Sequence, residues 1–289
     1  MLIRYNYLKM LLIFFRCLFY SGFWLLLSGF FFQSFSSNWK DISSGLRYLE
    51  YDATQKSISG DSKISVLKID TSKYSLHLIL SAQNDKQFRT VKEWAHYKNL
   101  TAVVNAGMYR ETGVHTGYVK NYTYENKLTL TPAYKSILAF NPKNNTMPSI
   151  KIIDLQYDDF YSIKKNYNTL LQNIRMIDSH QENRWVQQPK VSSITVLGMD
   201  KSGNILFIFC RSPYTVHDFI TMLLSLPLNL YHCMYLEGGS VASFYVKSGE
   251  FEIEKSGGFE SALFTNTTTN ILLPIPNVIG IKEKSVNHD

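Results

Sequence analysis

One stretch of the sequence decides the fold class: NILFIFC at residues 204–210, TVHDFITMLLSL at residues 215–226 and CMYLEGGS at residues 233–240. The first segment is short and continuously apolar, which is typical of a buried β-strand. The second begins with a helix-capping pattern at Thr215, repeats its apolar side chains at helical spacing and stops before Pro227. The third contains another short apolar run. This order predicts a βαβ-like unit over residues 204–237.

The remaining sequence after residue 36 indicates hairpins and few helices. Thr90 and Glu93 form a capping box that predicts a short helix, and Asp200 to Gly203 is a good hairpin turn. Residues 157–168 give no clear pattern. Further strands are predicted at residues 45–52, 63–70, 74–80, 101–104, 134–140, 149–155 and 193–198. We therefore expect an α+β fold, a mixed β-sheet with short helices, formed by one domain over residues 37–289.

The first 36 residues have the pattern of a targeting segment. Arg4, Lys9 and Arg16 precede or interrupt an apolar run over residues 10–32, and polar residues follow. A positive start followed by an apolar segment predicts a secretion signal or an uncleaved anchor in the inner membrane. A buried core helix is the alternative. We expect the rest of the chain to be exported, to the periplasm or beyond the cell.

Composition excludes several classes of protein. Apolar residues at 45% and charged residues at 18% exclude an intrinsically disordered chain. The formal net charge is +7, and the three cations of the first 36 residues contribute to it, so the rest is mildly basic. No cluster of Lys and Arg is interleaved with aromatic residues, so we expect no nucleic-acid partner. A mildly basic exported protein suits a phosphorylated or acidic glycan.

Two cysteines remain after the N-terminal segment. Cys210 and Cys233 both lie in apolar, strand-like runs. They are either buried thiols or, if their strands are neighbours, a disulfide pair.

Two places in the sequence share one pattern, a short apolar strand followed by a polar side chain and then glycine. They are Val104-Asn105-Ala-Gly107 and Leu236-Glu237-Gly-Gly-Ser240. Ligands of open sheets collect at the carboxyl ends of parallel strands, and glycine there allows a close approach. If the two strands are parallel in one sheet, Asn105 and Glu237 lie at the same edge. Two ordinary turns with solvated side chains are the alternative.

These segments resemble a known family. The motif Asn105-Ala-Gly-Met-Tyr109 is similar to the Asn-x-Gly-Met-Phe motif of phosphodiester glycosidases, and Gly117-Tyr-Val119 follows it. Strand 203–209, the helix start at 214–219 and the segment 234–240 then occur in the order found in that family. The resemblance covers about residues 60–265. Two features depart from it: Glu237 replaces the family's Asp, and an Arg before the central hairpin has no clear match, Lys190 being the nearest cation.

The resemblance implies hydrolysis of the bond between an anomeric carbon and a phosphate group, as part of envelope or extracellular glycan metabolism. Glu237 is the expected catalytic carboxylate, which activates water or stabilises positive charge on the sugar ring. We expect the Asn105 amide to assist it by contacting sugar or phosphate oxygens. The remaining expected substrate-binding residues are Gly107, Arg175, Arg211, His217, Gly238, Gly239 and Ser240; the arginines would bind phosphate, and the N–H groups of the two consecutive glycines would hold an anion. His217 is otherwise a surface residue beside a helix cap.

Other chemistries are not supported by the sequence. Gly239-Ser240 lacks the final glycine of a nucleophile elbow, and the histidines and cysteines lack zinc-ligand spacing. The sequence predicts no metal and no cofactor. The resemblance implies cleavage at the sugar carbon, and the lack of a metal-binding cluster to assist attack on phosphorus is consistent with it. The competing hypothesis is a glycan-binding or polysaccharide-assembly protein that keeps the fold without turnover.

Overall fold

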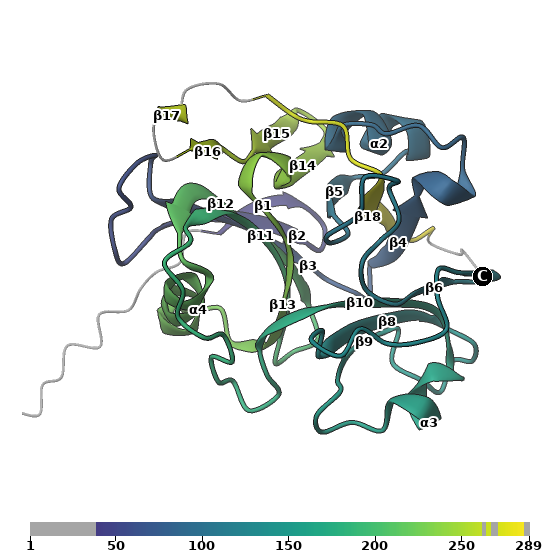
Figure 1. Ribbon diagram of the computed structural model, residues 1–289. Helices are drawn as coiled ribbons and strands as arrows, with labels where there is room; N and C mark the ends of the chain where they lie inside the picture. The colour runs from purple at the N-terminus through teal and green to yellow at the C-terminus, as the bar shows by residue number, and fades with distance from the viewer. Residues whose placement is uncertain (1–38, 262–263, 267–270, 286–289) are drawn as a thin grey trace, which may run out of the picture. The chain divides into compact units, whose positions relative to one another are not determined.

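The computed structural model describes residues 39–261, 264–266 and 271–285. The predicted signal or anchor, residues 1–36, lies outside these residues. Within the described ranges, no helix is long and apolar enough to cross a membrane. Residues Asn38–Asp289 form one compact unit, built mostly of β-strands (Figure 1).

The larger sheet has the strand order β1-β2-β3-β12-β11-β13-β10-β6-β7, and β8 and β9 extend it from β10. Its strands are β1 (Lys40–Ser43), β2 (Leu46–Asp52), β3 (Lys63–Ile69), β6 (Val119–Asn121), β7 (Tyr124–Glu125), β8 (Ser136–Pro142), β9 (Ile150–Asp154), β10 (Tyr167–Ile177), β11 (Ser192–Asp200), β12 (Ile205–Tyr214) and β13 (Leu230–Gly238). A second sheet has the order β15-β14-β5-β18-β4. Its strands are β4 (Tyr74–Leu80), β5 (Ala102–Asn105), β14 (Ser243–Ser248), β15 (Phe251–Ser256) and β18 (Asn277–Glu283). A short hairpin joins β16 (Phe259–Ser261) to β17 (Phe264–Asn266).

Few helices accompany the sheets in the described part of the chain. They are α2 (Val91–Lys98), α3 (Phe160–Lys164), α4 (Val216–Ser225) and the 3-10 turns η1 (Ser81–Gln83) and η2 (Gly239–Val241). Both predicted helices are confirmed. Thr90 and Glu93 form the complete capping box of α2, and the Thr215 side chain caps α4 by accepting from the Asp218 N–H group. α3 and the start of β10 occupy the region that gave no clear sequence pattern.

The prediction of a mixed sheet is wrong for the described strands, because every pairing between them is antiparallel. The βαβ-like unit nevertheless exists. β12 and β13 both pair antiparallel with β11, which lies between them, so β12 and β13 run parallel to each other without touching. α4 makes the crossover (Figure 1). The hairpin predicted at Asp200 inserts this third strand into the unit.

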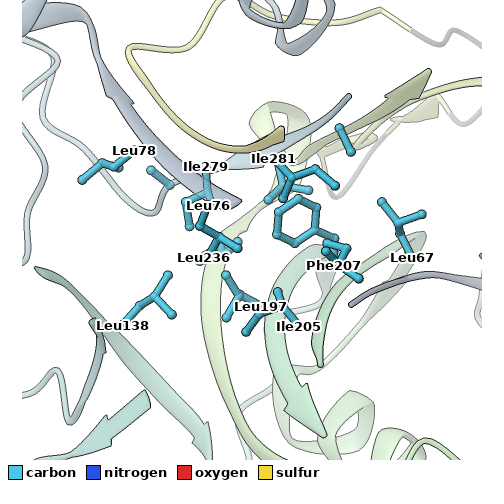
Figure 2. Close-up of a cluster of buried hydrophobic side chains, with 14 of the residues drawn as sticks. Leu67, Leu76, Leu78, Leu138, Leu197, Ile205, Phe207, Leu236, Ile279 and Ile281 are labelled. Atoms are coloured by element: carbon cyan, nitrogen blue, oxygen red, sulfur yellow. The ribbon is translucent and has the colours of Figure 1, made fainter. Parts of the chain in front are cut away.

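The main core lies between the two sheets. Leu197, Phe207 and Leu236 from the larger sheet pack in one cluster with Leu76, Ile279 and Ile281 from the second (Figure 2). The opposite face of the larger sheet packs against α4 in a separate cluster. The central strands are therefore buried on both faces, which explains their continuous apolar runs.

Cys210 and Cys233 are buried and form no disulfide. Cys210 is paired with Ile194 and Cys233 with Gly198, at different levels of the intervening strand β11. The separation of β12 from β13 excludes a bridge between these thiols.

Candidate active site

Glu237 lies at the end of β13, opposite Thr195 of β11. Its Oε1 atom accepts a hydrogen bond of 3.0 Å from the Gly238 N–H group. Burial raises the pKa of the Glu237 carboxyl to about 7, against the opposing effects of this N–H group and of the Lys190 charge. A carboxyl of this kind exchanges protons readily near neutral pH, as a general base requires.

The glycines after Glu237 are required by close packing. A Cβ atom on Gly238 would lie 2.2 Å from the Tyr235 hydroxyl oxygen and 2.9 Å from the Ser193 carbonyl oxygen. Gly239 has φ of +67° in open surroundings, so its requirement is conformational. Because the Gly238 N–H group donates to Glu237, that group is not available to hold an anion as expected from the sequence. Ser240 follows in η2, partly buried.

Asn105 lies in the other sheet but reaches the segment that follows Glu237. Its Nδ2 atom donates to the Val241 carbonyl oxygen at 2.7 Å, and its Oδ1 atom accepts from the Ser243 N–H group at 2.7 Å. The side chain is buried. The amide is therefore engaged by the protein, and Asn105 fixes the segment that follows Glu237. The expected arrangement, two parallel strands that end at one sheet edge, is wrong: Glu237 ends β13 of the larger sheet and Asn105 ends β5 of the second. Asn105 instead bonds to the segment after Glu237 where that segment enters β14, the neighbour of β5.

Gly107 lies against two buried polar side chains. A Cβ atom there would be 2.1 Å from Asn173 Oδ1 and 2.6 Å from His115 Nε2, and the Gly107 φ is +137°. Asn173 donates to the Ala106 carbonyl oxygen at 2.9 Å, while His115 Nδ1 accepts from the Gly117 N–H group. Burial lowers the pKa of His115 to about 4, so the ring is neutral with its proton on Nε2. These contacts fix the turn that leads from β5 to Tyr109.

Tyr109 is partly buried, and its ring packs edge-on against Phe88 with ring centroids 6.5 Å apart. Burial and the nearby charge of Glu237 raise the pKa of the Tyr109 hydroxyl. Tyr109 and Val241 also pack against the same apolar cluster beneath α2. The first motif therefore places the Tyr109 hydroxyl where the charge of Glu237 raises its pKa.

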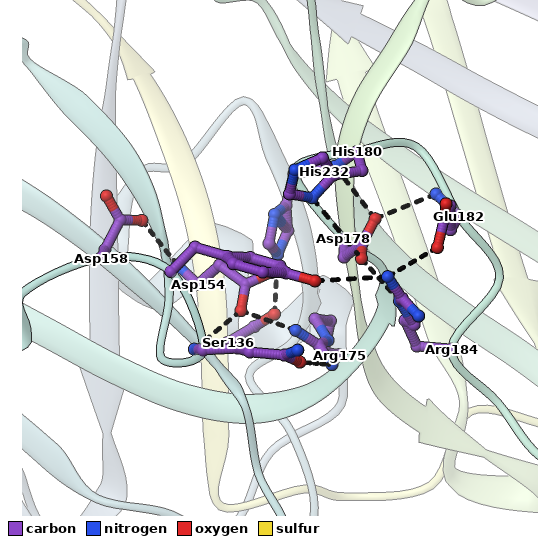
Figure 3. A network of polar contacts seen from close by, with 11 residues as sticks. Ser136, Asp154, Asp158, Arg175, Asp178, His180, Glu182, Arg184 and His232 are labelled. Atoms are coloured by element: carbon purple, nitrogen blue, oxygen red, sulfur yellow. Dashed lines mark hydrogen bonds and ion pairs between the residues drawn. The ribbon is translucent and has the colours of Figure 1, made fainter.

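The expected cations lie in different places. Arg175 Nη1 donates to Asp154 at 2.6 Å and its Nη2 to Gln156 at 2.9 Å, within a polar network that also contains Ser136 and His232 (Figure 3). Both charged side chains of this ion pair are almost completely buried. Arg175 thus neutralises an internal carboxylate, and both of its terminal nitrogens are engaged within the protein.

Arg211 connects the two sheets, since its Nη1 atom donates to the Ser256 carbonyl oxygen at 3.2 Å. His217 lies in the first turn of α4, where its Nδ1 atom is 3.3 Å from Asp218. No contact among the described residues connects His217 to Glu237. Within the same described ranges, no group of three or more His, Cys, Asp or Glu side chains is arranged to hold a metal ion.

The model of the phosphodiester glycosidase family matches residues 98–282. The chain belongs to the phosphodiester glycosidase family. The matched region contains both glycine motifs, so the resemblance drawn from them is confirmed.

Solved structures agree on the fold of this phosphodiester glycosidase family member. One is the catalytic domain of zebrafish N-acetylglucosamine-1-phosphodiester alpha-N-acetylglucosaminidase, auto-inhibited by its pro-peptide. It matches with a TM-score of 0.56 at 14% identity, over 84% of this chain and 85% of that one. A hypothetical protein from Synechocystis matches with a TM-score of 0.53 at 11% identity, over 83% of this chain and 62% of that one. No curated protein matches the chain.

Several residues around Glu237 and Gly107 have no signal in the sequence. Thr195 is fully buried opposite Glu237, and its hydroxyl has no hydrogen-bond partner in the described structure. Asn173 and His115 are buried beside Gly107, and no pattern in the sequence singles them out. Tyr109 is the last residue of the first motif, but nothing in the neighbouring sequence indicates that its hydroxyl lies near a carboxylate.

Proposed function

We propose that the protein hydrolyses sugar-1-phosphodiesters at the bond between the anomeric carbon and the phosphate oxygen. Membership of the family supports glycosidase activity on phosphodiester sugars. The carboxyl of Glu237 is the observation that assigns this activity to a site. It lies at the end of a strand, and burial raises its pKa to about 7. A glycan-binding protein without turnover has no need of a carboxyl that titrates at neutral pH.

The proposed reaction uses the ionised carboxylate. Glu237 accepts a proton from water as the water oxygen bonds to the anomeric carbon. The bond from that carbon to the bridging oxygen breaks, and the phosphate group leaves with all of its oxygens. Positive charge that develops on the sugar ring is stabilised by the same carboxylate. Since a phosphate monoester is a stable anion, its departure needs little protonation, and one carboxylate is sufficient.

Lys190 is the cation best placed to attract the phosphate. It is exposed, and its charge lowers the pKa of Glu237 against the larger effect of burial. An exposed ammonium group retains its hydration until a ligand arrives and attracts an anion without requiring a buried partner. Asn105 contributes by fixing residues 241–243, which follow the catalytic segment.

A panel of sugar-1-phosphodiesters tests the proposal, with release of reducing sugar as the measurement and the Glu237→Gln protein as the control. Reaction in ¹⁸O-labelled water then identifies the broken bond. We expect the label in the sugar, and label in the phosphate would overturn the mechanism. Retention of glycans on a column without any sugar release would favour the binding protein over the hydrolase.

The proposal places the enzyme outside the inner membrane, where it acts on envelope or extracellular glycans. The pattern of the first 36 residues supports this location. A reporter fused after Asp289 should be active outside the inner membrane, and activity confined to the cytoplasm would exclude an envelope substrate.

A further inference from the structure

Tyr109 packs against the same apolar cluster as Val241, which follows Glu237 by four residues. Asn105, four residues earlier, bonds to residues 241–243, and the intervening Ala106 carbonyl oxygen accepts from Asn173. Tyr109 itself forms an antiparallel bridge with His115. These backbone contacts, together with the packing of the ring on Phe88, fix the position of the phenol.

The Tyr109 hydroxyl makes no hydrogen bond with any residue that the structure describes. Other tyrosines of the protein engage theirs: Tyr118 donates to Glu125 at 2.5 Å, Tyr245 to Glu252 at 3.0 Å and Tyr214 to the Gln55 carbonyl oxygen at 2.7 Å. Tyr109 also keeps part of its surface exposed. A rigidly held hydroxyl that is left without a protein partner is available to a ligand.

The charge state of this hydroxyl suits a donor. Burial and the charge of Glu237 both disfavour the phenolate, so Tyr109 stays protonated at neutral pH. A neutral donor has a further advantage at this place. A second cation beside Glu237 would lower the pKa of the carboxyl and weaken it as a base, whereas a phenol leaves the pKa raised.

We propose that the Tyr109 hydroxyl donates a hydrogen bond to a non-bridging phosphate oxygen of the substrate, and so acts as a catalytic residue. The inference rests on the proposed function and adds a phosphate ligand to it. The phosphate is joined to the anomeric carbon through one oxygen, so its free oxygens lie close to the carbon that Glu237 serves. As the bond to carbon breaks, negative charge grows on the phosphate and the hydrogen bond strengthens. The bond therefore lowers the barrier in addition to holding the substrate.

The test compares Tyr109→Phe with Tyr161→Phe, a matched loss of a hydroxyl at a position that is 77% exposed on α3. Binding of inorganic phosphate is measured by titration calorimetry, and release of sugar from a sugar-1-phosphodiester is measured separately. We expect Tyr109→Phe to weaken phosphate binding about 10-fold or more and to lower kcat/KM by about 10–100-fold, as loss of a hydrogen bond to a charged group does. Tyr161→Phe should change neither quantity.

A second measurement is made on the wild-type protein. With tyrosine labelled at the ¹³Cζ position, the Tyr109 resonance of the wild-type protein should shift when phosphate is added, while the Tyr161 resonance stays. Unchanged phosphate binding in Tyr109→Phe, or no phosphate-dependent shift of Tyr109, would overturn the inference. Failure of the wild type to release sugar from any phosphodiester would instead refute the hydrolase proposal. In that case, a 10-fold loss of phosphate binding in Tyr109→Phe would still identify Tyr109 as a phosphate ligand.

Discussion

Replacement of Glu237 by glutamine should remove turnover and at the same time stabilise the protein at alkaline pH. Burial raises the pKa of Glu237 from 4.5 to about 7. Each pKa unit corresponds to about 1.4 kcal/mol, so ionised Glu237 costs the folded state about 3 kcal/mol relative to a solvated carboxylate. Glutamine has nearly the same shape and carries no charge, and it avoids this cost.

The direction in which stability changes with pH follows from proton binding. The folded protein holds the Glu237 proton more tightly than the unfolded chain does, so the stability contributed by this group is complete below pH 4.5 and is lost as pH rises to about 7. At pH 5 the two proteins should therefore have similar stability. At pH 8 the variant should be more stable by about 3 kcal/mol, or about 6–12 °C in Tm for a domain of this size.

Urea unfolding at pH 5 and pH 8 measures the difference, and Glu250→Gln is the control because Glu250 is exposed and its side chain forms no ion pair with any described residue. The same preparations are assayed for sugar release. Wild-type kcat/KM should rise with pH up to about 7, where Glu237 becomes ionised, and the Glu237→Gln protein should be slower by about 10²–10⁴-fold. An identical pH dependence of stability in wild type and variant would refute the reasoning, because Glu237 would then titrate as a solvated group.

Three further predictions concern the residues around the site. Asn105→Ala should lower the free energy of unfolding by about 2 kcal/mol and reduce kcat, since it leaves the buried carbonyl and N–H groups of residues 241 and 243 without partners; unchanged kcat in a folded variant would exclude the positioning role. Gly107→Ala should lower the free energy of unfolding, measured in urea, by about 3 kcal/mol, because the new Cβ atom would lie 2.1 Å from Asn173 Oδ1. An unchanged free energy of unfolding would contradict this close approach. Arg175→Met should lower the free energy of unfolding by about 3–5 kcal/mol, because it leaves Asp154 charged and buried. The double variant with Asp154→Asn should recover much of this stability. Loss of phosphate binding in a stable Arg175→Met protein would instead identify Arg175 as a phosphate ligand.

Local patterns were sufficient for the parts of the fold that depend on neighbouring residues. The cap at Thr215, the capping box at Thr90 and the turn at Asp200 each act within a few positions, and all three are present in the structure. The order of β-strands was harder to predict. β5 pairs with β14 and β18, strands more than a hundred positions away, and such pairings have no local signature.

The strand β10 was missed for a different reason. Its sequence mixes apolar residues with Gln172, Asn173 and Arg175, and buried polar residues break the alternation that identifies a strand. Each is satisfied by a distant partner: Gln172 by the Thr131 carbonyl oxygen, Asn173 by Ala106 and Arg175 by Asp154. The sequence shows the polar residue but not the partner that permits its burial.

The same argument explains why Arg175 was attractive as a phosphate ligand. A sequence identifies a cation, but the carboxylate that neutralises it decides whether it can bind an anion. Asp154 is followed closely along the chain by Gln156, and the two together engage both terminal nitrogens of Arg175. Within the described structure, the cation that acts on Glu237 is the exposed Lys190, and the further phosphate donor that we propose is the neutral hydroxyl of Tyr109. Among the described residues, Lys190 is the cation whose charge lowers the pKa of Glu237, and its effect is smaller than that of burial, so burial holds the carboxyl at a pKa of about 7.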